Sequence, residues 1–103
     1  MVHARAAGRY APPAYAVAIS NAMSDLLKRI AEERDQGAFA ELFRTFGPKV
    51  KAMLMRSGAD AATAEDIAQE TLLSVWRKAH LFVEGKGSVA TWMFTIARNL
   101  RID

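Results

Sequence analysis

The chain has 103 residues, which is enough for one domain and short for two. Half of the residues are hydrophobic (51%) and a quarter are charged (24%), the balance of an ordinary globular protein. The absence of cysteine excludes a disulfide framework, a thiolate metal site and a cysteine nucleophile. The formal net charge of +3 is compatible with an anionic partner such as nucleic acid without requiring one.

Residues 1–22 carry Ala, Pro and Gly without a helical period, and we interpret them as a flexible leader. Two adjacent prolines interrupt the short apolar run that a secretion signal would need, so the pattern does not favour a signal peptide. Met23 begins a Met-Ser-Asp sequence typical of a natural start, and we expect the domain to comprise residues 23–103. No run approaches the roughly twenty apolar residues of a membrane span, so we expect no membrane insertion.

Periodic apolar residues begin after Ser24, a suitable N-cap, and predict a first helix that weakens near Asp35. A second helix is predicted over residues 38–57, where apolar residues recur at steps of three and four. Pro48 falls inside it and predicts either a kink or two helices end to end. The expected core residues of these two helices are Leu26, Leu27, Ile30, Phe39, Leu42, Phe43, Phe46, Val50, Met53 and Leu54.

A third helix is predicted from Asp60, a plausible N-cap, to about Ala79. After a loop over residues 80–87, Ser88 caps a fourth helix with no stop signal, and we expect the chain to be part of a longer protein. The sequence therefore predicts an all-α fold, a compact bundle of about four helices. Its expected core residues in the last two helices are Ala64, Ile67, Ala68, Thr71, Leu72, Val75, Ala79, Val89, Trp92, Met93, Ile96 and Leu100.

The third predicted helix has a second stripe, opposite its core stripe. Carboxylates and an amide around an exposed leucine can form a docking surface for a basic partner. An ordinary solvated face with one exposed leucine is the alternative, and spacing alone favours it. A metal site is not favoured, because no histidine lies at a ligand spacing from these carboxylates. The stripe consists of Asp66, Gln69, Glu70, Leu73 and Arg77.

The fourth predicted helix carries arginines beside hydroxyls and an aromatic ring, away from its core face. Single-stranded nucleic acid is bound by such sets, with charge for phosphates and rings for bases. The preceding loop has two glycines around Lys86 and can surround an extruded base, and Ser88 can meet a phosphate. A solvated basic face and a plain connection are the alternatives. The outward face consists of Thr91, Phe94, Thr95, Arg98, and Arg101 or Ile102, and Asn99 lies between the arginines in sequence.

The sequence gives no sign of catalysis. No histidine lies near a serine in a nucleophile, base and orienter arrangement, and the phosphate-binding pattern GxxxxGK[ST] is absent. We therefore expect that the chain is not an enzyme and has no cofactor or metal.

Three motifs in a fixed order are more specific than any one of them. Residues 38–50 hold AFAELF and FGPKV, residues 64–76 hold AED-x-x-QE followed by a tryptophan, and residues 91–99 hold TW-x-x-x-IARN. In this order, over about residues 24–103, the chain resembles region two of the extracytoplasmic-function (ECF) sigma factors of bacterial RNA polymerase.

The resemblance implies a cytoplasmic transcription initiation factor domain that docks on polymerase core and melts the minus-ten promoter element. The D-x-x-Q-E face would dock on the clamp helices of the beta-prime subunit, and the loop would read a flipped base of the non-template strand. Trp92 lies in the melting segment but is expected to pack first. The implied polymerase-binding residues are Asp66, Gln69, Glu70 and Leu73, and the implied DNA-binding residues are Val83, Glu84, Gly85, Lys86, Gly87, Ser88, Thr95, Arg98, Asn99 and Arg101.

Departures from the family pattern limit these expectations. Thr95 stands where the family often has a basic residue, and the loop from Glu84 to Gly87 indicates no base preference. The family's second domain, region four, which reads the minus-thirty-five element, is absent from this chain, and an anti-sigma factor is an expected partner. The alternative function is a helical domain that binds an anti-sigma or other regulatory protein and no DNA. An independent duplex-binding protein is less favoured, because the third helix is acidic outside.

Overall fold

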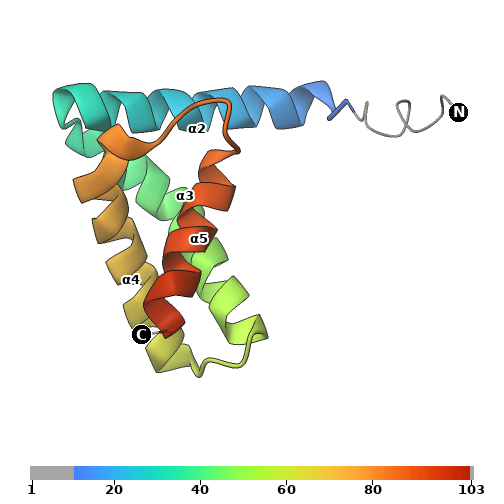
Figure 1. Ribbon diagram of the computed structural model, residues 1–103, viewed down its shortest axis with the longest axis vertical. Coiled ribbons are helices and arrows are strands. Elements are labelled where there is room, and N and C mark those ends of the chain that lie inside the picture. Colours follow the sequence, from blue (N-terminus) through green and yellow to red (C-terminus); the bar gives the residue numbers. More distant parts are fainter. Residues whose placement is uncertain (1–10, 103) are drawn as a thin grey trace, which may run out of the picture.

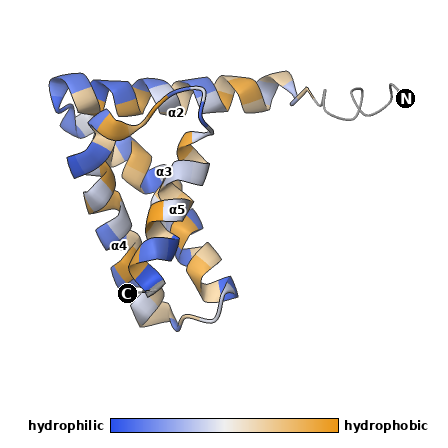
Figure 2. Cartoon of the chain, viewed as in Figure 1, coloured by the Kyte–Doolittle hydropathy of each residue, from blue (hydrophilic) through white to orange (hydrophobic). Residues whose placement is uncertain are grey.

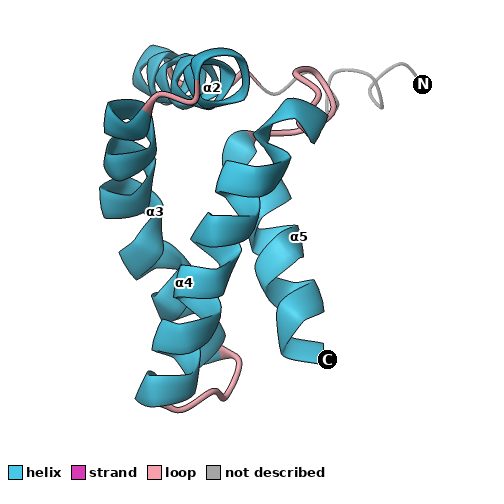
Figure 3. Cartoon of the chain, turned by 90° about the vertical axis from the view of Figure 1, so that its left-hand side faces the viewer, coloured by secondary structure: helices cyan, strands magenta, loops and turns pink. Residues whose placement is uncertain are grey.

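The computed structural model describes residues 11–102, and four long helices contain most of them (Figure 1). Helix α2 lies across one end of the other three helices, and its N-terminal half extends beyond them (Figure 1). Figure 3 shows helices and loops, with no strand in this part of the chain. The predicted all-α bundle is confirmed. Its elements are α2 (Ala14–Glu33), α3 (Gln36–Arg56), α4 (Ala61–Lys78), the 3-10 turn η1 (Ala79–Leu81) and α5 (Val89–Ile102).

The start of the first helix was predicted wrongly. Helix α2 begins at Ala14, well before Ser24, and the backbone carbonyl of Pro13 accepts its first hydrogen bonds. Residues 14–22 contain no Gly or Pro, and a proline at a helix entrance costs little because the first N–H groups lack helical partners. The expected flexible leader therefore overlaps a helix, and its first ten residues lie outside the described part of the chain.

Side-chain caps fix the starts of three helices. The Oδ1 atoms of Asp35 and Asp60 accept hydrogen bonds from the N–H groups of Ala38 (3.0 Å) and Thr63 (2.7 Å). These N–H donors are the main reason that the pKa of each aspartate lies below its ordinary value. The hydroxyl of Ser88 caps α5 in the same way, so the predicted caps at positions 60 and 88 are confirmed.

Helix α3 runs through Pro48 as a single element, so of the two predicted alternatives, a kink or two helices end to end, the second is wrong. Proline has no N–H, and one carbonyl of the preceding turn loses its helical donor. Buried residues before and after the proline, Leu42 and Val50, pack into the core on both sides of it. Packing along the whole helix therefore outweighs the local cost of the proline.

The predicted core is confirmed. All the expected core residues are buried or half-buried, and Figure 2 shows hydrophobic and hydrophilic residues alternating along the helices. One cluster joins α2 to the other helices, and a smaller one lies between α3, α4 and α5 around Val50, Leu54 and Ala97. No helix in the described range is long and apolar enough to cross a membrane.

Arg34, in the turn between α2 and α3, contacts Trp76 near the end of α4. Arg34 has a left-handed backbone (φ 52°), which is unfavourable for a residue with a side chain. Its guanidinium lies 4.0 Å from the centre of the Trp76 ring and donates a hydrogen bond to the Trp76 carbonyl at 2.8 Å. The Trp76 ring also packs edge-on against Phe39 at 5.1 Å. These contacts offset the strain and fix the end of α4 beneath α2.

Replacing each of two adjacent leucines of α4 by alanine should have very different effects on the free energy of unfolding. Leu72 is fully buried, so Leu72→Ala should lower the free energy of unfolding by about 2–5 kcal/mol. Leu73 is 44% exposed, so Leu73→Ala should change it by no more than about 0.5 kcal/mol. Urea unfolding followed by circular dichroism measures both values, and equal losses would contradict the assigned faces of α4.

Candidate protein and nucleic-acid interfaces

Helix α4 displays its predicted polar stripe on the outside of the bundle. The four residues of the stripe that we call the docking face are all exposed, while Thr71, Leu72 and Val75 on the opposite side are buried. An exposed leucine among polar groups gives this face an apolar anchor surrounded by hydrogen-bonding groups. The docking face consists of Asp66, Gln69, Glu70 and Leu73.

Neighbouring side chains orient the acceptors of this surface. The Gln69 amide donates to Glu65 Oε2 at 3.2 Å, and Lys51 of α3 pairs with Glu65 Oε1 at 3.1 Å. The hydrogen bond from Lys51, followed by that from Gln69, holds the pKa of Glu65 below its ordinary value. Glu70 pairs with Arg77 at 3.0 Å. All of these pairs are exposed, so they orient side chains more than they stabilise the fold.

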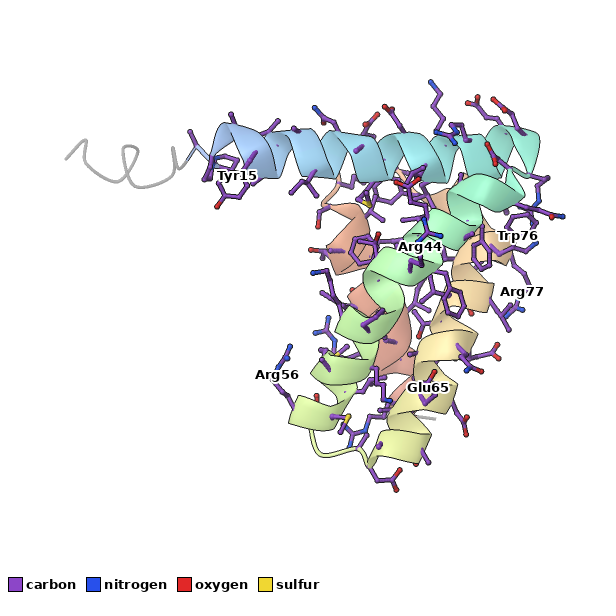
Figure 4. All side chains as sticks on the ribbon, turned by 180° about the vertical axis from the view of Figure 1, so that it is seen from behind. Tyr15, Arg44, Arg56, Glu65, Trp76 and Arg77 are labelled. Carbon is purple, nitrogen blue, oxygen red and sulfur yellow. The ribbon has the colours of Figure 1, made fainter. Side chains whose placement is uncertain are left out.

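A groove between α3 and α4 adjoins the docking face. Its volume is about 400 Å³, and the glycine of α3 and the alanine of α4 that line it leave room between the helices. Figure 4 shows Arg44 and Glu65, which both line the groove, on this side of the molecule. Sequence reasoning missed the groove, although small residues on both helices were a visible signal. Its lining includes Phe43, Arg44, Gly47, Lys51, Ala68 and Gln69.

The loop before α5 encloses a smaller hollow, which we call the loop hollow. Its volume is about 260 Å³, its walls are mainly apolar, and Lys86 stands among them as the charged group. Gly85 and Gly87 have φ values of 96° and 120°, in a region where residues with a side chain are strained. The loop shape therefore depends on both glycines. The loop hollow is lined by Leu81, Phe82, Val83, Lys86, Thr91, Trp92 and Thr95.

Both ends of the loop are anchored. The rings of Phe82 and Trp92 lie 5.5 Å apart, and both pack against the larger core cluster. Trp92 is half-buried, which confirms its predicted packing role. At the other end, the hydroxyl of Ser88 accepts from the N–H of Thr91 at 3.1 Å and contacts its hydroxyl at 3.1 Å. The residues between these anchors, including Val83 and Glu84, are exposed.

The outward face of α5 differs in part from the prediction. Thr95, Arg98 and Asn99 are exposed, as expected of residues that contact a partner. Phe94 is half-buried against the smaller core cluster, so its predicted place away from the core is wrong. The reason is that α5 packs against α3 as well as α4, which widens its buried side beyond the stripe that periodicity predicts.

Arg101 has a partner within the protein. Its Nη1 donates to the carbonyl of Ser57 at 2.9 Å and lies 3.5 Å from that of Leu54. These carbonyls belong to the C-terminal end of α3, where a positive charge is favoured by the helix dipole. Arg101 therefore ties the end of α5 to the end of α3, a role that the sequence did not indicate.

The described residues bring together no group of three His, Cys, Asp or Glu side chains that could hold a metal ion. The groups at the candidate surfaces are hydrogen-bond donors and acceptors, cations and aromatic rings. Such groups bind proteins and nucleic acids.

Comparison with known families gives this arrangement a context. A family model described as Sigma-70 region 2 matches residues 42–103, which is more than half of the chain. The chain belongs to the sigma-70 region 2 family. The match includes the docking face, the loop hollow and all of α5, so the predicted resemblance is confirmed.

Individual relatives place the chain in the ECF group. It is 58% identical over 78 residues to the ECF RNA polymerase sigma factor RpoE of Cereibacter sphaeroides, a match that covers 76% of this chain and 43% of the relative. It is 36% identical over 85 residues to the ECF RNA polymerase sigma factor SigK of Mycobacterium tuberculosis, covering 82% and 45%.

A solved structure also matches. In the crystal structure of Rhodobacter sphaeroides SigE in complex with the anti-sigma ChrR, a chain is 54% identical to this one, with a TM-score of 0.76. The match covers 77% of this chain and 51% of that one. The chain thus spans about half the length of the relatives it matches.

The Arg101 contact can be tested by unfolding. Arg101→Leu keeps an apolar stem but removes the donor to the Ser57 carbonyl, and should lower the free energy of unfolding by roughly 1 kcal/mol. Arg98→Leu is the control, because Arg98 is exposed on the same helix and should cost little. Matching urea midpoints for the two variants would show that the contact adds no stability.

Proposed function

We propose that this chain is the part of an ECF sigma factor that docks on the RNA polymerase core and opens the minus-ten element of a promoter. The observation that carries the proposal is the presence of two different surfaces on one bundle of this family. One is the exposed docking face of α4, and the other is the loop hollow with the outward face of α5. The domain would act in the cytoplasm, by binding rather than by catalysis.

The docking face suits the clamp helices of the beta-prime subunit. Asp66 and Glu70 offer carboxylate oxygens to basic side chains, and Gln69 offers both a donor and an acceptor. Leu73 supplies the apolar anchor that a small interface needs, because a few desolvated residues carry most of the binding energy. The adjoining groove between α3 and α4 extends the surface that a helical partner would cover.

The loop hollow suits a base of the non-template strand. A base can enter it only after leaving the duplex stack, so binding there favours the single strand over the duplex. The apolar walls would contact the ring, and Lys86 would meet a neighbouring phosphate. Along α5, Arg98 would contact the backbone and the Asn99 amide would donate a hydrogen bond. The Thr95 hydroxyl donates its proton to the Thr91 carbonyl at 2.9 Å, so it would accept a hydrogen bond. Melting then follows from the preference for the unpaired strand.

The complete protein would have further parts and partners. The relatives are about twice as long as this chain, which supports the presence of a second, promoter-reading domain in the whole protein. The crystal structure of SigE, to which this chain is similar, contains SigE in complex with the anti-sigma ChrR. An anti-sigma factor is therefore proposed as a partner of this protein too. A domain that only bound such a regulator would not need the cationic loop hollow.

Docking is tested by binding of the chain to a beta-prime clamp-helix fragment. The triple variant Asp66→Ala, Gln69→Ala, Glu70→Ala should weaken binding at least tenfold, since it removes the acceptors of the docking face. Glu32→Ala, Glu33→Ala removes the same charge from α2 and should bind normally. Isothermal titration measures the affinities, and circular dichroism checks folding. Unchanged binding by the triple variant would place the contact elsewhere.

DNA binding is tested by the salt dependence of affinity for single strands. The unmodified chain should bind a single strand more tightly than the duplex of the same sequence. Lys86→Gln and Arg98→Gln should each lower the slope of log K against log salt by about 0.7, the value for one phosphate contact with a single strand. Fluorescence anisotropy provides the measurement. The regulator-binding alternative predicts no preference for single strands and unchanged slopes.

A further inference from the structure

A second hollow lies beside the first turn of α5, on the side away from the loop hollow. Its volume is about 330 Å³, and it is enclosed by the N-terminal half of α2, by α3 and by the start of α5. We call it the α2 hollow. Figure 4 shows Tyr15 on the side of α2 turned toward the bundle. Residues that define it are Tyr15, Ile19, Phe46, Lys49, Ser88 and Phe94.

The outer wall of the α2 hollow is apolar, and its side chains are largely exposed within the described part of the chain, residues 11–102. Tyr15 is 71% exposed and Ile19 is 56% exposed. Figure 2 shows that this part of α2, beyond the bundle, is largely hydrophobic. The inner wall contains Phe94, whose half-buried ring is held by the smaller core cluster. The hollow thus offers two fixed rings, those of Phe46 and Phe94, and the accessible ring of Tyr15 to a planar group.

The charge around this hollow favours an anionic occupant. Lys49 is the one charged residue among its described lining residues, and none of them is a carboxylate. Residues 42–56 of α3 and all of α5 (residues 89–102) contain basic residues and no acidic ones. Aromatic rings beside a cation, without carboxylates, are the combination that proteins use to bind single-stranded nucleic acid.

The two hollows border the same helical turn. Thr91 and Trp92 line the loop hollow, while Val89 and Ala90 line the α2 hollow. A helix with its side chains is roughly 10–12 Å wide, and a strand advances by about 3.4 Å per nucleotide when stacked. A strand that crosses the first turn of α5 therefore spans the two hollows with about three nucleotides, or fewer if it is extended.

We propose that the α2 hollow is a second nucleobase site on the same single strand of DNA, with Lys49 holding the adjoining phosphate. The inference rests on the proposed function, because the strand must cross α5 to reach this site. Tyr15 would stack on the base, and the Ser88 hydroxyl lies where it can meet the backbone between the two sites.

An abasic scan tests this proposal. A single-stranded oligonucleotide selected from a random pool for binding to the unmodified chain is resynthesised with one base removed at a time. Two sensitive positions are expected, no more than about three nucleotides apart. Tyr15→Ser should lower affinity about fivefold or more and abolish the penalty at one of the positions. Leu81→Ser, Val83→Ser, in the loop hollow, should abolish the penalty at the other.

Matched variants control for changes in fold and charge. Val17→Ser alters an exposed residue of α2 outside the hollow, and Lys28→Gln removes a charge elsewhere on α2; both should bind like the unmodified chain. Lys49→Gln should lower the salt slope by about 0.7. If Tyr15→Ser and Lys49→Gln behave like the controls while the loop variant weakens binding, the second site is overturned and the proposed function stands. If the pool yields no binder, or the loop variant has no effect, both are overturned.

Discussion

The packing of α4 against α3 is the contact on which the remaining arrangement depends. Ala64 and Ala68 are buried at the facing positions of α4, and their small side chains allow α3 to approach closely. Leu72 and Val75 continue the same stripe into the larger cluster. Once this side of the helix is buried, its opposite side must face solvent, and that side is the docking face. The position of the docking face is therefore a consequence of core packing.

Charge is divided between the helices in a way that keeps the surfaces distinct. The exposed acids of α4 lie on the docking face and beside it, whereas α5 has no acidic residue within its helical range. A basic partner and an anionic partner are thus attracted to different parts of one small domain. Such a division would allow polymerase and DNA to be bound at the same time, which the proposed function requires.

Periodicity was sufficient to predict the core and the outward stripe of α4, because each depends on one helix packing on one side. It failed where tertiary packing alters a helix. Phe94 is half-buried because α5 contacts two neighbours, and Arg101 faces the end of α3. The start at Ala14 was missed because Ser24 has the form of a cap and the preceding residues lack charge. The α2 hollow could not be predicted, since it is assembled from three segments distant in sequence.

The projection of α2 beyond the bundle has a consequence for how sequences of this kind can vary. Tyr15 and Ile19 are more than half exposed, so exchanging them should change the free energy of unfolding by no more than about 0.5 kcal/mol. The buried residues that support the opposite end of the helix, such as Leu27 and Ile30, have no such freedom. The C-terminal half of α2 thus tolerates little mutation because it is buried in the core. Its exposed N-terminal half can change, and so acquire new binding preferences, without loss of folding.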